Sequence, residues 1–166
     1  IFWGDSGPLR NGKGSPYEGG YRLPCIVRWP GNVPAGRVSD AVFATIDLMP
    51  TFARLAGFDP PSDRRIDGVD QTDLLLGRSN RGRDHFYFQG AGVRQGKWKY
   101  LKPKAFFHGY AKEDDRPETP ELYDLEADLH EQNNLAQIHP DKVNELHALM
   151  ESLEGGDRLR PDDNKR

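Results

Sequence analysis

A lysine flanked by two glycines is the feature of this sequence best suited to chemistry. Lys13 lies between Gly12 and Gly14 in a glycine-rich stretch that runs from Leu9 to Pro24. Glycine has no Cβ, so it accepts positive φ angles and lets a ligand approach the backbone closely. A tight loop of this kind can hold an ammonium group facing an oxyanion. The alternative for the same three residues is a surface turn with a solvated lysine.

The glycine-rich stretch leads into a short apolar run that predicts a buried strand. Residues 25–29 read Cys-Ile-Val-Arg-Trp and precede a Pro-Gly turn signal, as is typical of a core strand. Such a strand would anchor the loop at one end and so hold Lys13 in place. Cys25 is then a buried strand residue, and as the single cysteine of the chain it cannot form an internal disulfide.

The composition argues against two classes of partner. The chain has 166 residues and a formal net charge of −3 at pH 7. This length suits one domain or a small pair, and the small net charge does not indicate a nucleic-acid partner. No apolar stretch is long enough to span a membrane, so we expect no membrane partner either. The sequence does not begin with methionine, and we expect it to be the interior of a longer polypeptide.

A helical segment is expected before residue 80. Capping and stop signals predict a helix over residues 47–56, since Asp47 can cap its start and Gly57 can end it. Its apolar side is expected to face the core. The residues concerned are Leu48, Met49, Phe52, Leu55 and Ala56.

A small sheet with one covering helix is expected after residue 84. Alternating apolar residues predict antiparallel strands joined as hairpins. These strands are expected over residues 85–89, 91–94, 97–101 and 122–125. Apolar residues at helical spacing predict a helix over 140–153 that covers the sheet and ends at Gly155-Gly156. The charged residues 157–166 predict a disordered tail.

Several blocks of this sequence, taken in order, resemble the sulfatase family. The blocks are residues 7–14, 18–31, 45–51, 66–70, 93–99 and 122–125. They correspond to the C-terminal portion of arylsulfatases and N-acetylgalactosamine-6-sulfatases. The resemblance implies an α/β, alkaline-phosphatase-like fold with a smaller C-terminal antiparallel sheet and helix. Residues 1–83 would then be the C-terminal part of the catalytic domain, 84–156 the sheet-and-helix subdomain and 157–166 the disordered tail.

The resemblance also implies an activity and a site. Sulfatases hydrolyse sulfate esters: a formylglycine hydrate attacks sulfur while Ca²⁺ (or Mg²⁺) and basic side chains neutralise the sulfate oxygens. Lys13 matches the family lysine that contacts the sulfate, so it is the predicted catalytic and substrate-binding residue. Glu18 and Arg22 also match family positions, and we interpret them as an ion pair that braces the loop. A sulfated small molecule or glycan is the implied substrate, and a periplasmic or secreted enzyme is the implied location.

Two parts of the family site have no counterpart in this sequence. The family nucleophile arises from a Cys/Ser-x-Pro/Ala-Ser-Arg motif, which the sequence does not contain. Asp5 is the only candidate metal ligand, but it lies closer to Lys13 in sequence than the family's metal pair, and we interpret it as a loop residue. We therefore expect the chain to be inactive alone and to act with the missing N-terminal part of the same polypeptide.

Two other functions stay open. A phosphatase or phosphodiesterase of the same superfamily is one, because an oxyanion-binding lysine does not by itself distinguish sulfate from phosphate. A non-catalytic module that binds sulfated glycans is the other. An incomplete domain should also expose apolar surface around Ile26, Val27 and Trp29.

Overall fold

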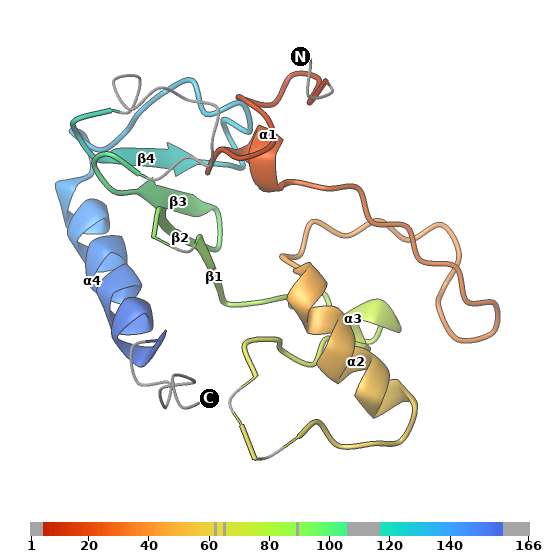
Figure 1. The fold of residues 1–166 in the computed structure, drawn as a ribbon. Helices are drawn as coiled ribbons and strands as arrows, with labels where there is room; N and C mark the ends of the chain where they lie inside the picture. Colours follow the sequence, from red (N-terminus) through yellow and green to blue (C-terminus); the bar gives the residue numbers. More distant parts are fainter. Residues whose placement is uncertain (1–4, 62, 65, 89, 106–116, 158–166) are drawn as a thin grey trace. The chain divides into compact units, whose positions relative to one another are not determined.

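The chain folds into two compact units, each described here by itself (Figure 1). The computed structural model describes residues 5–61, 63–64, 66–88, 90–105 and 117–157. One unit comprises residues 1–23 with 85–166, and the other residues 24–84.

This division differs in part from the predicted domains. The predicted boundary after residue 83 falls next to the division at 84/85, but residues 1–23 group with the sheet. The assignment of residues 1–83 to a catalytic domain concerns the whole protein and stays a prediction. The predicted disordered tail lies, from residue 158 onward, outside the described residues.

The first unit is built on a four-stranded antiparallel sheet. Its strands pair in the order β1-β2-β3-β4, and the four predicted strands are confirmed. They are β1 (His85–Phe88), β2 (Gly92–Gln95), β3 (Trp98–Leu101) and β4 (Glu121–Asp124). The register sets Lys99 opposite Arg94 on one side and Tyr123 on the other. Lys99 is therefore in the middle of a polar row that crosses three strands.

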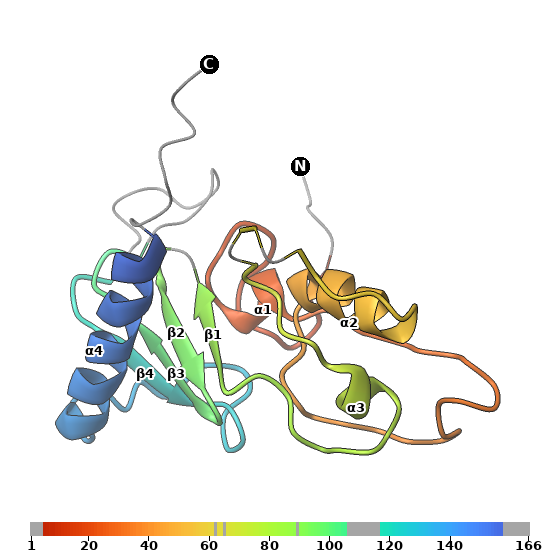
Figure 2. The same ribbon diagram turned by 90° about the horizontal axis from the view of Figure 1, so that it is seen from below.

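The two faces of the sheet carry different side chains, because successive strand residues point to opposite sides. Trp98 and Tyr100 of β3 pack on the side of α4 (Pro140–Asp157), which lies along the sheet (Figure 2). Lys99 and Leu101 alternate with them, and Leu101 packs in the cluster of the other face. The helix was thus correctly predicted to cover the sheet.

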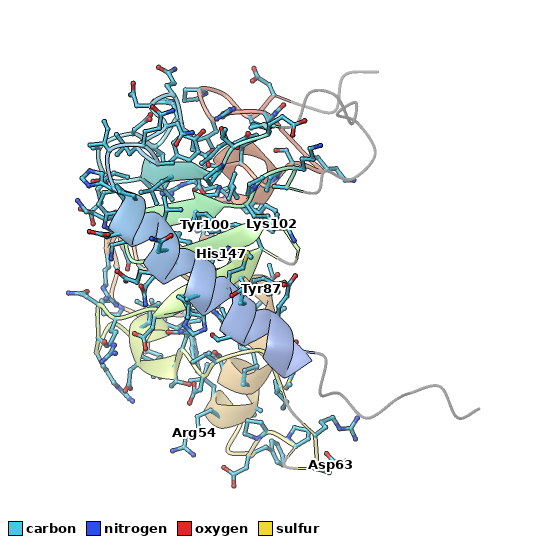
Figure 3. The ribbon with its side chains drawn as sticks, turned by 90° about the vertical axis from the view of Figure 1, so that its left-hand side faces the viewer. Arg54, Asp63, Tyr87, Tyr100, Lys102 and His147 are labelled. Atoms are coloured by element: carbon cyan, nitrogen blue, oxygen red, sulfur yellow. The ribbon has the colours of Figure 1, made fainter. Side chains whose placement is uncertain are left out.

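Helix α4 packs through residues at helical spacing. Leu146 and Met150 are buried against Val93, Tyr100 and Leu122 of the sheet. Tyr100 Oη also lies 3.0 Å from Nδ1 of His147 (Figure 3). The predicted end at Gly155-Gly156 is wrong, since α4 continues to Asp157. Glycine lowers helix propensity by about 1 kcal/mol relative to alanine but still donates its backbone N–H, so it does not force a helix to end.

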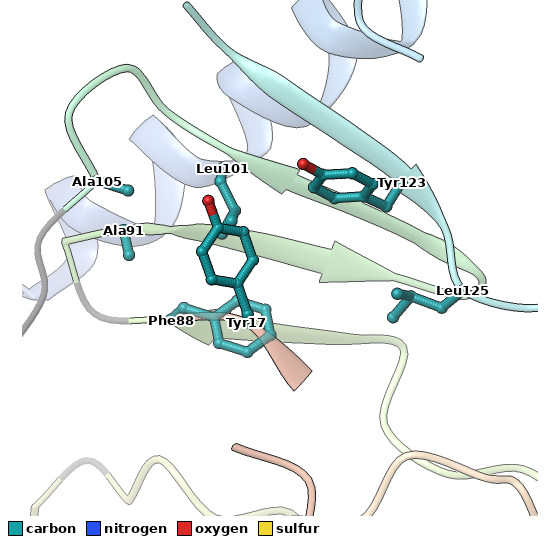
Figure 4. Close-up of a cluster of buried hydrophobic side chains, with 7 residues drawn as sticks. All are labelled: Tyr17, Phe88, Ala91, Leu101, Ala105, Tyr123 and Leu125. Atoms are coloured by element: carbon teal, nitrogen blue, oxygen red, sulfur yellow. The ribbon is translucent and has the colours of Figure 1, made fainter. Parts of the chain in front are cut away.

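The opposite face of the sheet is covered by the N-terminal segment of the chain. Tyr17, which precedes α1 (Glu18–Tyr21), is buried there in a cluster with side chains of the sheet and its loops (Figure 4). The other members are Phe88, Ala91, Leu101, Ala105, Tyr123 and Leu125. The glycine-rich stretch is therefore anchored by packing on the sheet.

The second unit is held by polar contacts around one aspartate. Its elements are η1 (Thr45–Asp47), α2 (Leu48–Leu55) and α3 (Thr72–Leu75). The buried Asp47 accepts the N–H groups of Ala44 at 2.9 Å and Val69 at 2.8 Å, and it pairs with Arg83. The predicted helix over 47–56 is confirmed, with Gly57 at φ +79° after its end. None of the helices described in either unit is long and apolar enough to cross a membrane.

The predicted buried strand over residues 25–29 is wrong. These residues form no strand, Cys25 is exposed, and Ile26 is 93% exposed. A strand needs a neighbour for its N–H and C=O groups, and none of the described strands lies within residues 24–84. Met49 and Phe52 of α2, and Ala56 just after its end, are also exposed, so the prediction that they face the core is wrong. The expected apolar surface around Ile26, Val27 and Trp29 is confirmed.

Candidate functional site

Lys13 lies in a tight, exposed turn of the glycine-rich stretch. The N–H of Ser15 donates to the carbonyl of Gly12 at 3.1 Å and closes the turn around the lysine. Gly14 has φ +92°, as expected from its position after Lys13, whereas the residue with positive φ before the lysine is Asn11 and not Gly12. Lys13 itself is exposed, so its ammonium is presented on the surface of this unit.

A second hydrogen bond closes the wider loop that carries Lys13. The N–H of Gly19 donates to the carbonyl of Arg10 at 3.0 Å. We call residues 10–19, which this bond closes, the Lys13 loop. The two backbones approach so closely that a Cβ on Gly19 would lie 2.2 Å from the carbonyl oxygen of Asn11. Glycine is therefore required at position 19 for the loop to close.

The first flank of the Lys13 loop is fixed by Arg10. Its Nη1 donates to Tyr123 Oη at 2.6 Å, to Glu121 Oε1 at 3.2 Å and to the carbonyl of Glu131 at 2.9 Å. The guanidinium carbon also lies 3.8 Å from the ring centroid of Tyr17, a cation–π contact within the loop. Arg10 thus joins the loop to β4 and to the segment that follows it.

A buried carboxylate on β4 joins the same cluster. Glu121 accepts hydrogen bonds from Tyr17 Oη at 2.8 Å and from the hydroxyl of Tyr123. Burial, and then the charge of Glu121 together with its hydrogen bond, raise the pKa of Tyr17 well above its ordinary range. The pKa of Tyr123 is also raised, by burial first and then by Glu121. Both phenols therefore stay protonated and act as donors across the neutral pH range.

The second flank of the Lys13 loop is fixed by Glu18. Its Oε1 lies 3.0 Å from the Nζ of Lys99, and its N–H donates to Glu131 Oε2 at 2.7 Å. The Nζ of Lys99 lies 2.8 Å from Oε1 of Glu131. All three side chains are buried, which makes this a desolvated triad. The predicted ion pair of Glu18 and Arg22 is confirmed at 3.5 Å, at the exposed edge of the triad.

The triad has an excess of negative charge at its centre. Burial raises the pKa of Glu131, and the Lys99 ammonium opposes this rise. Lys99 also lies 4.7 Å from the ring centroid of Phe88, whose face favours a cation. The single ammonium thus compensates two buried carboxylates, with Arg22 adding a second, more distant positive charge.

The residues present do not fit the metal site that the resemblance implies. Asp5 is exposed, and its Oδ1 accepts the N–H of Gly7 at 2.8 Å, as in an ordinary loop turn. Within the described ranges, no three His, Cys, Asp or Glu side chains are grouped so that they could hold a metal ion. The formylglycine motif is likewise not present in the printed sequence. No chemical step is therefore assigned to either group on this chain.

Sequence reasoning missed the residues that position the Lys13 loop. Lys99 carried a usable signal, because it is a lysine between Trp98 and Tyr100 on a strand whose neighbours alternate in and out. Glu131 and Glu121 carried none, since they are ordinary acidic residues more than 100 positions from the loop they contact. Lys13 itself was found, and its contact with sulfate stays a prediction.

Known proteins similar to this chain are sulfatases. Residues 12–155 match the family described as N-sulphoglucosamine sulphohydrolase, C-terminal. The N-acetylgalactosamine-6-O-sulfatase of Bacteroides thetaiotaomicron is 36% identical over 154 residues, which cover 89% of this chain and 30% of that protein. The steryl-sulfatase of Mus musculus is 47% identical over 85 residues, or 51% of this chain and 14% of that protein.

The structural comparison agrees with the sequence comparison. The PsFucS1 sulfatase from Pseudoalteromonas sp. has a TM-score of 0.78 and 25% identity over 95% of this chain and 34% of its own. The predicted alkaline-phosphatase-like fold class, with its small sheet and C-terminal helix, is thereby confirmed. Since the family match includes Lys13, the sheet and most of α4, this chain belongs to the sulfatases, in the N-sulphoglucosamine sulphohydrolase C-terminal family.

Proposed function

We propose that this chain is the C-terminal part of a sulfuric ester hydrolase in which Lys13 binds the sulfate oxygens. The main support for the proposal is that the Lys13 loop is fixed to the sheet at both flanks. Arg10 binds Tyr123 on one flank, and Glu18 binds Lys99 on the other. Family membership supports it, because the matched residues 12–155 include Lys13 and the strands that hold its loop.

The proposed role of Lys13 follows from the charge that sulfate-ester cleavage must accommodate. Breaking the S–O bond leaves negative charge on the sulfate oxygens and on the departing oxygen. A cation held in place before the reaction stabilises that charge without reorganising, and this is the main advantage of a preorganised site over water. A lysine on a braced loop meets this need, since its ammonium has three donors and a compact charge.

Other parts of the enzyme would come from outside this chain. The chain spans 30% of the length of the Bacteroides relative. In our proposal the remaining polypeptide supplies the formylglycine nucleophile and the ligands of Ca²⁺ or Mg²⁺, and it covers the apolar surface around Ile26. On that basis the chain is inactive alone.

A carbohydrate sulfate is the proposed substrate class. The Bacteroides relative, which matches 89% of this chain, is by name an N-acetylgalactosamine-6-O-sulfatase. On this basis we favour a sulfated sugar over a steryl or simple aryl sulfate.

A substrate panel on the full-length protein tests this proposal. The panel contains p-nitrophenyl sulfate, p-nitrophenyl phosphate, N-acetylgalactosamine 6-sulfate and a steroid sulfate. We expect hydrolysis of the sulfates, with the highest kcat/KM on the sugar. Preference for the phosphate ester would instead support a phosphatase of the same superfamily. Binding of sulfated glycans with no hydrolysis of any ester would support a non-catalytic module.

A further inference from the structure

We propose that Lys99 and Glu131 are positioning residues that set the place of Lys13 by holding both ends of its loop. The inference rests on the proposed function, because the loop they hold is the one that carries the proposed sulfate-binding lysine. Lys99 ends one of the blocks that resemble the family, and Glu131 lies outside all of them.

Glu131 contacts both ends of the Lys13 loop. Its side-chain Oε2 accepts the N–H of Glu18 at 2.7 Å, and its backbone carbonyl accepts Arg10 Nη1 at 2.9 Å. Glu131 has φ +55°, a backbone conformation that is uncommon for residues other than glycine. In this conformation one residue presents its carboxylate to one end of the loop and its carbonyl to the other.

Lys99 supplies the charge that makes this arrangement stable. It is 0% exposed, and its Nζ lies 2.8 Å from Glu131 Oε1 and 3.0 Å from Glu18 Oε1. Without the ammonium, two buried carboxylates would face one another across a few ångströms and one of them would have to move or take up a proton. Glu18 belongs to the Lys13 loop, and Glu131 contacts that loop at Glu18 and at Arg10. Displacement of either carboxylate would therefore disturb the loop.

The burial of Lys99 separates its role from that of Lys13. A fully buried ammonium that is already shared by two carboxylates cannot reach a substrate at the surface of this unit. Lys13 is exposed and lies five positions before Glu18 on the same loop. Lys99 is therefore assigned to holding the loop, and contact with the sulfate is assigned to Lys13.

The experiment uses variants of the full-length protein and two independent measurements. The variants are Lys99→Met, Lys99→Arg, Glu131→Gln and the double variant Lys99→Met/Glu131→Gln. Lys97→Met is the matched control, because Lys97 lies two residues away, is 40% exposed and pairs with Asp124 instead of the loop. The measurements are hydrogen exchange of the peptide covering residues 9–20 and kcat and KM on a sulfate ester.

We expect Lys99→Met to speed exchange in the 9–20 peptide and to lower kcat/KM by about 10- to 100-fold, since a displacement of about 1 Å has effects of that size. Lys99→Arg, which keeps the positive charge, should show slower exchange and a higher kcat/KM than Lys99→Met. Glu131→Gln keeps an oxygen for the Glu18 N–H and should have a smaller effect. The double variant removes one cation and one anion, so its effect should be smaller than that of Lys99→Met alone.

Exchange of the 9–20 peptide in folded Lys99→Met that is no faster than in Lys97→Met would overturn the inference. If Lys99→Met does not fold, the same comparison is made with Glu131→Gln, whose exchange should be faster than that of Lys97→Met by a smaller factor, and equal rates would overturn the inference. Accelerated exchange with unchanged kcat and KM would also overturn the inference, because Lys99 and Glu131 would then stabilise the loop without affecting the reaction. A failure of the proposed function looks different: Lys13→Ala would leave kcat/KM unchanged, whatever the exchange experiment reports about Lys99.

Discussion

The Nζ of Lys99 on β3 lies 3.0 Å from Oε1 of Glu18, a residue 81 positions earlier in the chain. This contact joins the C-terminal sheet to the loop that carries Lys13. The sheet-and-helix unit thus has a role beyond its own stability, since its buried charges determine where a proposed sulfate-binding group lies.

Arg10 should be replaceable neither by alanine nor by lysine. Arg10→Ala removes the donor to Tyr123, Glu121 and the Glu131 carbonyl, and leaves the buried Glu121 carboxylate without its cation. We expect a loss of about 1–3 kcal/mol in the free energy of unfolding. Arg10→Lys should recover little, because an ammonium cannot stack on Tyr17 as the planar guanidinium does.

Denaturant unfolding of the full-length protein measures the effect of Arg10. Arg78→Ala is the control, because Arg78 and its partner Asp73 are both well exposed, and such pairs contribute at most about 1 kcal/mol. Equal unfolding midpoints for Arg10→Ala and Arg78→Ala would contradict the importance given to the Arg10 contacts.

Two glycines of the Lys13 loop should respond very differently to a methyl group. The Cβ of Gly19→Ala would overlap the carbonyl oxygens of Asn11 and Arg10, at 2.2 Å and 2.5 Å. The Cβ of Gly12→Ala would meet only Ser6 Oγ, at an ordinary 3.6 Å. We expect Gly19→Ala to destabilise by about 1–3 kcal/mol or more, with faster hydrogen exchange at residues 9–20. Gly12→Ala should leave that exchange near the wild-type rate, and a reversed order would show that the loop closes in another way.

The stability of the protein should fall with rising pH through the titration of Glu131. Burial raises the pKa of Glu131 above its ordinary value of 4.5, so the folded state binds more protons than the unfolded state in the window just above that value. The free energy of unfolding then falls as pH rises from 4.5 through the raised pKa. Glutamine at this position does not titrate.

The test is to measure the unfolding midpoints of wild type and Glu131→Gln between roughly pH 4 and pH 8, the range in which carboxylates and histidines titrate. The stability of wild type relative to Glu131→Gln should decline as pH rises. A relative stability that instead increases with pH would mean that the pKa of Glu131 is lowered and that Lys99 overcomes the cost of burial.

The 166-residue chain should expose apolar surface in solution. Ile26, Val38 and Phe58 are 93%, 88% and 69% exposed, and exposed apolar side chains that lie together promote association. We expect the chain alone to bind an apolar fluorescent dye and to self-associate in light scattering. Ile26→Ser combined with Phe58→Ser should reduce both signals. A monodisperse chain that binds no dye would argue against a covering partner for this surface.

The sheet could be predicted from the sequence because its signal is local. Lys97 to Tyr100 alternate between polar and apolar residues, and the turn at Gln95-Gly96 joins them to the preceding strand. The helix over 140–153 has the same kind of local signal in Leu146 and Met150. Patterns of this length specify an element without information about its neighbours.

The positions of the charged residues could not be predicted, because they depend on contacts distant in sequence. Glu18 was expected to pair with Arg22, four residues away, and it does. Its buried contacts with Lys99 and Glu131 could be predicted only with knowledge of how the loop packs on the sheet. The strand predicted over Cys25 to Trp29 is wrong for a related reason. An apolar sequence forms a strand only where another strand offers its hydrogen-bonding edge.

The most direct test of the account is the effect of Lys13→Ala on sulfate-ester hydrolysis by the full-length protein. We expect kcat to fall by about 10²- to 10³-fold, the usual effect of removing one preorganised donor from a developing negative charge. Lys142→Ala, which removes a half-buried lysine of α4 paired with Glu145, should leave kcat unchanged. Equal kcat for Lys13→Ala and Lys142→Ala in folded protein would contradict the assignment of Lys13 to the sulfate.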